Sequence, residues 1–247
     1  MPDPQLCRRV EEASLNAWPA LQQSLLDGWV LRFSRGFTKR ANSIVPLYRA
    51  EQNALEKVRY CENLYAREQL KTIFRLTTVV ESQALDQLLA QRGYQRVDPT
   101  HVLVRDLQSL PVSGHAQFRE LPRADWLDAY TRASEVPQAS VQLHAMLLSG
   151  IRTDHVFGAI VVDGTPVACG LAVLERELVG LFDLVTHPAA RRRGHARALV
   201  ESLLAWGARG GALHAYLQVV ESNTPAHALY ERLGFARLYE YWYRMAS

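Results

Sequence analysis

One stretch of the chain, residues 180–197, constrains the fold more than any other. It contains an apolar run, residues 181–185, that Pro188 brings to an end, and this pattern is typical of a buried strand. Residues 196–205 follow with Leu and Val at helical spacing. The sequence therefore predicts a strand that leads into a helix across residues 191–196.

The junction between this strand and this helix is suited to bind an anion. The first turn of a helix has backbone amides without an intrahelical partner, and the aligned peptide dipoles add partial positive charge there. Gly194 and Ala196 keep the approach to these amides open, and Arg192, Arg193 and Arg197 add charge. The sequence therefore predicts a turn that holds a phosphate group.

The spacing of these residues resembles the signature of a known superfamily. The hexapeptide 191–196, Arg-x-x-Gly-x-Ala, is similar to the (Gln/Arg)-x-x-Gly-x-(Gly/Ala) motif of the GNAT acyl-CoA-dependent N-acyltransferases. A predicted strand at residues 217–220, Asn223 after it, and the ending Tyr-Glu-Arg-Leu-Gly-Phe of residues 230–235 fall where that family has its next elements. The resemblance implies an α/β (α+β) GNAT fold, with a mixed, mostly antiparallel sheet and flanking helices.

The composition indicates an ordinary globular chain of 247 residues, 48% apolar and 21% charged. The formal charge of +3 suits a polyanionic small ligand, and no stripe of Lys and Arg interleaved with aromatic residues indicates a nucleic-acid partner. The N-terminus lacks a signal-peptide core, and no apolar run approaches the roughly 20 residues that span a bilayer. We therefore expect a cytoplasmic monomer or homodimer without a membrane or nucleic-acid partner.

The three cysteines, Cys7, Cys61 and Cys169, are scattered and show neither a CxxC motif nor metal-binding spacing with His. A sparse, odd set of this kind is typical of reduced thiols. We expect small buried side chains, no disulfide and no metal site.

The two halves of the chain end in similar patterns. Residues 84–94 and 227–235 each read as a helix closed by a Gly-aromatic pair, and a strand-like segment follows each of them. We infer a degenerate GNAT-like domain at residues 1–110 and a GNAT N-acetyltransferase domain at residues 116–247, joined by the turn-rich segment 108–116. Because the first half lacks the Arg-x-x-Gly-x-Ala turn, it is not expected to hold a cofactor.

Other segments give local expectations. Residues 5–27 are predicted to be helical with a break at Pro19, and residues 37–47 are predicted to pair as a hairpin with residues 28–33. Asp163-Gly164 is a strong signal for a type I′ hairpin turn. A polar cluster on the first hairpin either lines a substrate pocket or covers an outward face: Trp29, Arg32, Arg40, Asn42 and Ser43.

The resemblance implies acetyl-CoA as co-substrate and places the residues that bind it. In GNAT proteins the strand before the motif separates from the next strand, and its free backbone groups hydrogen-bond to pantetheine as an added strand would. Asn223 resembles a residue that contacts the cofactor arm; it could instead cap the last helix, for which we favour Thr224. The cofactor-binding set carried over by position is Leu184, Val185, Thr186, Arg191, Arg192, Arg193, Gly194, His195, Ala196, Arg197 and Asn223.

The resemblance also suggests an acid. Tyr230 matches the tyrosine with which the family protonates the departing thiolate, and a phenol of pKa about 10 is a sensible acid for a thiol of pKa about 8.5. A core role for this helical tyrosine is the alternative.

The base is less clear from the sequence. Gln218 stands where some relatives have a glutamate, and an amide cannot accept a proton. Asp183 is the preferred candidate, expected to share a sheet face with Val185, while Glu175 and Glu177 lie in the turn before it. A structural role for Asp183, and a chain of water molecules as the base, remain alternatives.

The predicted function is transfer of an acetyl group from acetyl-CoA to a primary amine of an unidentified acceptor, directly within a ternary complex. A non-catalytic acyl-CoA-binding or sensor module is the alternative, because Gln218 replaces an acidic residue. A nucleotide enzyme with a P-loop ranks far below both, because the Gly-Lys-Ser/Thr ending and the Asp or Glu companions for Mg²⁺ are absent from the sequence.

Overall fold

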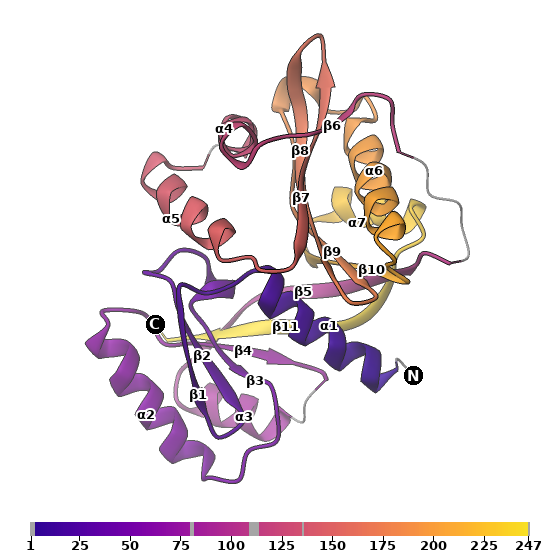
Figure 1. Cartoon of the computed structure of the whole chain (residues 1–247). Coiled ribbons are helices and arrows are strands. Elements are labelled where there is room, and N and C mark those ends of the chain that lie inside the picture. Colours follow the sequence, from indigo (N-terminus) through magenta and orange to yellow (C-terminus); the bar gives the residue numbers. More distant parts are fainter. Residues whose placement is uncertain (1–2, 80–81, 109–113, 135, 247) are drawn as a thin grey trace.

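A mixed sheet runs through the part of the chain that the computed structural model describes, residues 3–79, 82–108, 114–134 and 136–246 (Figure 1). Its strands are β1 Gln22–Leu26, β2 Trp29–Phe33, β3 Ile44–Pro46, β4 Ile73–Thr77, β5 Gln95–Asp106, β6 Phe118–Glu120, β7 Asp154–Val162, β8 Thr165–Glu175, β9 Leu178–Thr186, β10 His214–Val220 and β11 Ala236–Met245. The helices are α1 Pro4–Ala17, α2 Ala54–Arg67, α3 Gln83–Gln91, α4 Arg123–Ser134, α5 Gln138–Ser149, α6 His195–Arg209 and α7 Thr224–Arg232, with 3-10 turns η1 Lys39–Ala41 and η2 Pro188–Ala190.

The two halves of the chain exchange their last strands. The order across the sheet is β1-β2-β3-β4-β11-β5-β10-β9-β8-β7-β6. The last strand of the first half, β5, therefore pairs with β10, and the last strand of the chain, β11, pairs with β4. In Figure 1 the yellow β11 accordingly runs from the orange end of the molecule into the purple end.

The repeat predicted from the sequence is present as local structure. Gly93 after α3 and Gly234 after α7 both have positive φ, +85° and +79°, and each leads into a long strand, β5 or β11. The division into domains at residues 1–110 and 116–247 stays a prediction, since the sheet is continuous across it. The predicted linker falls largely on residues 109–113, outside the described residues.

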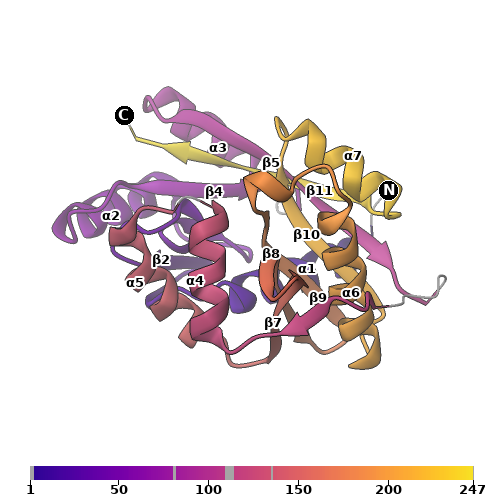
Figure 2. The same cartoon turned by 90° about the horizontal axis from the view of Figure 1, so that it is seen from above.

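Helices cover both faces of the strands that carry the predicted motif. α6 packs against β8 and β9 on one face, and α4 packs against the same strands on the other (Figure 2). Trp126 of α4 shares an apolar cluster with Leu171 of β8, while Leu203 of α6 shares a second cluster with Ala172, because successive strand residues point to opposite faces. In the described part of the chain, the helices are too short or too polar to cross a membrane.

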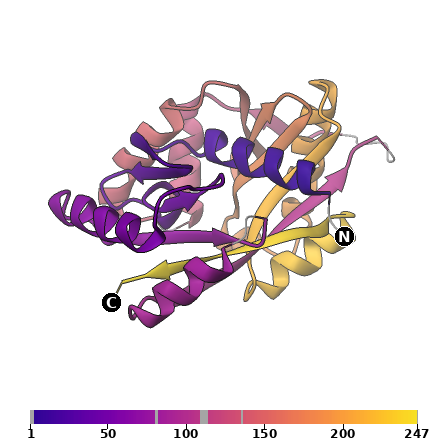
Figure 3. The same ribbon diagram turned by 90° about the horizontal axis from the view of Figure 1, so that it is seen from below.

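Helix α1 holds the two ends of the molecule together. It begins where the Asp3 side chain accepts a hydrogen bond from the Gln5 amide at 2.9 Å, and it lies across the sheet against β9 (Figure 3). Its buried Glu11 forms a bidentate ion pair with Arg75 of β4, at 2.5 and 2.9 Å, and accepts a hydrogen bond from Tyr239 of β11. One buried carboxylate thus joins a helix to two strands.

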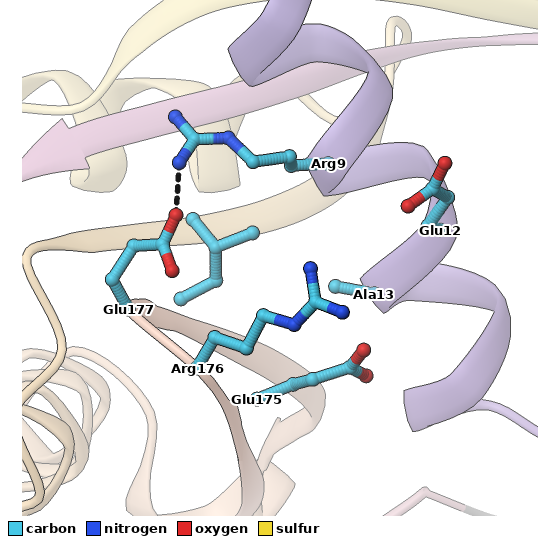
Figure 4. Close-up of a pocket in the computed structure, with 7 residues that line it drawn as sticks. Arg9, Glu12, Ala13, Glu175, Arg176 and Glu177 are labelled. Carbon is cyan, nitrogen blue, oxygen red and sulfur yellow. Dashed lines mark hydrogen bonds and ion pairs between the residues drawn. The ribbon is translucent and has the colours of Figure 1, made fainter.

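A second ion pair joins α1 to the second half of the chain. Arg9 of α1 donates to Glu177 in the turn between β8 and β9 (Figure 4). The space between these elements has a volume of about 10 Å³, which is room for about one water molecule. This pocket is therefore a packing gap rather than a ligand site.

Two sequence predictions about the first hairpin were wrong in part. The helix predicted over residues 5–27 ends at Ala17, and Gln22–Leu26 is a strand, because Asp27 and Gly28 with φ of +40° and +78° turn it back onto β2. The partner expected at residues 37–47 is reduced to Ile44–Pro46. The type I′ turn at Asp163-Gly164 is confirmed by φ of +48° and +77°.

The cysteines are buried and free, as predicted. Burial raises the pKa of the Cys61 and Cys169 thiols to about 12, which suppresses the reactive thiolate. They therefore act as apolar packing residues.

Candidate active site

The predicted turn between strand and helix is present. β9 ends at Thr186, a short 3-10 turn follows, and Arg192 and Gly194 have φ of +65° and +83° before α6 starts at His195. Glycine adopts this left-handed conformation without steric cost. Arg193 lies in the turn before the helix.

The amides at the start of α6 face open space. No side chain among the described residues caps this terminus. Counting from the start of the helix, the Ala198 amide is the first that has a hydrogen-bond acceptor in the described structure, namely the Gly194 carbonyl at 3.0 Å. A Cβ placed on Gly194 would meet nothing within 4 Å. The site therefore combines unpartnered amides, the positive end of a helix dipole and room for a ligand, which is what a phosphate group requires.

A cavity of about 850 Å³ lies in front of this turn, between α6 and α7. Arg197 is partly neutralised by Glu201 at 2.8 Å, and Arg191 donates to the Thr186 carbonyl at 3.4 Å. Arg193 and Asn223 are not among its lining residues. Nine of the predicted cofactor-binding residues line it: Leu184, Val185, Thr186, Arg191, Arg192, Gly194, His195, Ala196 and Arg197.

Strands β9 and β10 separate beside the cavity, as the resemblance implied. Their parallel pairing runs only from Leu178↔His214 to Leu181↔Leu217, so within the described residues the rest of β9 has no hydrogen-bonded neighbour strand on that side. A bulge against β8 coincides with a φ of +50° at Asp183. The separation opens a second cavity of about 230 Å³, lined by Arg40, Leu181, Phe182, Asp183, Leu184, Leu217, Gln218, Val219, Val220, Asn223, Ala226 and Tyr230.

Asp183 has two side-chain partners that the sequence did not reveal. Its Oδ2 lies 2.8 Å from His144 Nε2 of α5, and its Oδ1 accepts a hydrogen bond of 3.4 Å from the hydroxyl of Tyr130 of α4. The side chains of His144 and Asp183 are only 2% and 12% exposed. Burial, together with the charge of Asp183, raises the pKa of Tyr130, which therefore stays a hydrogen-bond donor. Trp18 and Phe37 pack against the His144 ring, with centroids 5.5 and 5.6 Å away, and fix its orientation.

Tyr230 lines both cavities and so stands where they meet. It is 8% exposed, and burial raises the pKa of its phenol to about 12. The hydroxyl therefore keeps its proton across the physiological range.

Asn223 caps α7, which corrects the prediction that Thr224 does so. Its side-chain oxygen accepts a hydrogen bond from the Ala226 amide at 3.2 Å, because Asn223 and not Thr224 is the last residue before the helical dihedrals begin. Asn223 also lines the smaller cavity.

Of the other polar residues considered as bases from the sequence, Gln218 lies at the site, and Glu175 and Glu177 do not. Glu175 and Glu177 lie at the opposite end of β9, bound to Asn16 and Arg9. Gln218 lines the smaller cavity, and its Oε1 accepts a hydrogen bond from Tyr241 at 3.1 Å.

The polar cluster of the first hairpin is divided between the core and the site. Trp29 belongs to an apolar cluster, and the buried guanidinium of Arg32 donates to backbone carbonyls. Asn42 and Ser43 are buried, and neither lines the cavity. Arg40 alone of the five lines it.

The family with the description "Probable histone acetyltransferase Rv0428c C-terminal" matches residues 6–244. The chain belongs to this family. It is 24% identical over 245 residues to "Uncharacterized N-acetyltransferase YobR" of Bacillus subtilis, covering 96% of this chain and 98% of that protein. The names of this family and of this relative both describe acetyltransferases, the activity that the GNAT resemblance implies.

Solved structures show the same fold. A GCN5-related N-acetyltransferase from Kribbella flavida superposes with a TM-score of 0.68 at 17% identity, covering 96% of this chain and 94% of that one. A tandem GNAT protein from the clavulanic acid biosynthesis pathway superposes with a TM-score of 0.59 at 13% identity, covering 83% and 75%. The predicted GNAT fold is thus confirmed, and the degenerate first half stays a prediction.

Proposed function

We propose that the protein is an N-acetyltransferase that moves an acetyl group from acetyl-CoA to a primary amine within one ternary complex. Acetyl-CoA supplies the acetyl group as a thioester, so that the new bond joins the amine nitrogen to the carbonyl carbon while the carbon–sulfur bond breaks. The observation that carries the proposal is the uncapped start of α6, open to a cavity that leads to the separation of β9 and β10.

Main-chain groups of this chain would hold the co-substrate. The amides of residues 192–197 would donate to the diphosphate, and the helix dipole adds to that attraction. The unpaired edge of β9 beyond Leu181, which includes Leu184, Val185 and Thr186, would hydrogen-bond to the pantetheine amides as a neighbouring strand would. Both interactions use backbone groups, so they depend on the turn and the strand separation more than on side-chain identity.

Asp183 would take the proton that the amine loses as it attacks. It lines the smaller cavity, and its carboxylate is held by Tyr130 and His144. His144 does not line the cavity and is therefore a positioning residue, which fixes the carboxylate and stabilises its charge.

Tyr230 would give a proton to the departing sulfur. It lies where the two cavities meet, and its raised pKa keeps the hydroxyl protonated. The two proton transfers at Asp183 and Tyr230 then leave the acetylated amine neutral and CoA as the thiol.

A steady-state assay of free CoA release over a panel of primary amines tests this proposal. We expect release that depends on both acetyl-CoA and an amine, with the acetylated product found by mass spectrometry. Tight CoA binding without turnover on any amine would instead support the acyl-CoA-binding module.

A further inference from the structure

One wall of the smaller cavity comes from the first half of the chain. Arg40 of η1 lines it, and every other lining residue comes from Leu181 or later. Hydrogen bonds from two buried side chains hold the turn that carries Arg40. Arg32 donates from Nη1 to the Arg40 carbonyl at 2.7 Å, and the Asn42 side chain makes hydrogen bonds to the backbone of residues 34–38. A charged side chain is thus held in place beside the site.

A hydrogen bond from Tyr241 sets the orientation of the Gln218 amide at this cavity. The Tyr241 hydroxyl donates to Gln218 Oε1 at 3.1 Å. With Oε1 acting as acceptor, the free end of the Gln218 amide is the Nε2 donor. This orientation leaves a donor, not an acceptor, at the cavity.

Two buried donors at this cavity lack an acceptor among the described residues. They are Nε of Arg40 and Nε2 of Gln218. Buried donors without an acceptor are unfavourable, and a ligand that supplies one relieves that cost. A carboxylate fits best, because its two oxygens match the planar donors of a guanidinium and an amide.

The opposite charge is present in the same cavity. Asp183 lines it, but its carboxylate is bound by His144 and Tyr130, and it makes no ion pair with Arg40 within the described structure. The cavity therefore holds a separated anion and cation, which complement a ligand that carries both charges. Its volume of about 230 Å³ suits a small ligand.

We propose that the acceptor is a small amino-acid zwitterion whose carboxylate binds Arg40 and Gln218 while its ammonium group lies beside Asp183, loses one proton to solvent and then attacks as the neutral amine. This rests on the proposed function, because it names the acceptor class of that same reaction. It also assigns a role to the degenerate first half of the chain, which supplies the residue that selects the acceptor's carboxylate.

Equilibrium binding tests the proposal independently of turnover. The full chain, saturated with CoA, is titrated by calorimetry with the twenty L-amino acids and with their carboxamides. We expect at least one amino acid to bind about 10- to 100-fold more tightly than its amide, as a charged hydrogen-bonded pair allows. Arg40→Gln should bring that ratio close to one, and Arg40→Lys should retain part of it. Arg35→Gln, an exposed residue of the same loop, is the matched control and should leave the ratio unchanged.

The outcomes separate the two proposals. Amides that bind as tightly as the free acids, or a ratio that persists in a folded Arg40→Gln variant, would overturn the zwitterion proposal. A carboxylate preference without CoA release for any amine would contradict acetyl transfer and leave the binding site standing. If amines that lack a carboxylate were acetylated with a kcat/KM equal to that of the amino acids, the zwitterion proposal would be contradicted and acetyl transfer would be supported.

Discussion

Substitution of Gly194 by glutamate should abolish CoA binding without unfolding the protein. The new side chain enters open space, since a Cβ there meets nothing within 4 Å, but it lies where a diphosphate would bind. A unit negative charge about 5 Å from one phosphate charge costs about 3 kcal/mol at an effective dielectric constant of about 20. We therefore expect CoA affinity to fall by at least about 100-fold.

The same helix provides a matched control at its other end. Gly211 also has a positive φ, +94°, and also has open space around its Cβ position. Both Gly→Glu changes carry the left-handed strain of a non-glycine residue, about 1 to 2 kcal/mol. The helix dipole favours the new charge at Gly194 and disfavours it at Gly211, by about 0.3 to 1 kcal/mol each. The Gly194→Glu variant should therefore be the more stable of the two and yet the one that fails to bind.

Calorimetric titration with CoA and urea unfolding, applied to both variants, measure the two effects separately. Unchanged CoA affinity in Gly194→Glu would refute the phosphate site at this turn. An equal loss of affinity in Gly211→Glu would show that the effect comes from general disruption of α6.

Four further predictions concern catalysis and stability. Tyr230→Phe should lower kcat by about 100-fold, as loss of a general acid does, with CoA affinity near that of the unmodified protein; equal rates would remove its role. Asp183→Asn should lower kcat by a similar factor, and a variant as fast as the unmodified chain would favour a water chain as the base. Because the pKa of Tyr230 is raised to about 12, its contribution to stability is complete below about pH 10 and is lost as the pH rises toward 12. Urea unfolding at pH 9 and pH 11.5 should therefore show a smaller decline in the free energy of unfolding for Tyr230→Phe than for the unmodified protein, and identical declines would contradict the burial of Tyr230. Glu11→Gln leaves Arg75 as an uncompensated buried charge and should cost about 3 kcal/mol of unfolding free energy, against less than about 0.5 for Glu12→Gln in its more exposed pair; equal losses would refute the role of the buried pair.

The sequence predicted the parts of the fold that local chemistry decides. The strand, turn and helix around Gly194 follow from an apolar run, a residue that tolerates positive φ and helical spacing, and all three are present. The same reasoning could have found β1, because Asp27-Gly28 is as strong a hairpin signal as Asp163-Gly164. It was missed because residues 22–26 form a mostly exposed edge strand without apolar alternation.

Long-range contacts could not be predicted from the sequence. The strand-like patterns of β5 and β11 carry no sign of which neighbour each strand pairs with, so their exchange is visible only in the sheet order. His144 is a single histidine on a helix, and its pairing with Asp183, 39 positions away, depends on how α5 packs over the sheet. The predicted cap at Thr224 failed by one residue, because Asn223 and Thr224 are both good caps and the choice depends on the backbone before the helix.

A crystal structure of the protein with CoA tests the central claim most directly. The account predicts diphosphate oxygens at hydrogen-bonding distance from the main-chain amides of residues 192–197, with the pantetheine arm along the unpaired edge of β9 and the thiol near Tyr230. Diphosphate bound elsewhere, or these amides left without contact to it, would contradict the account.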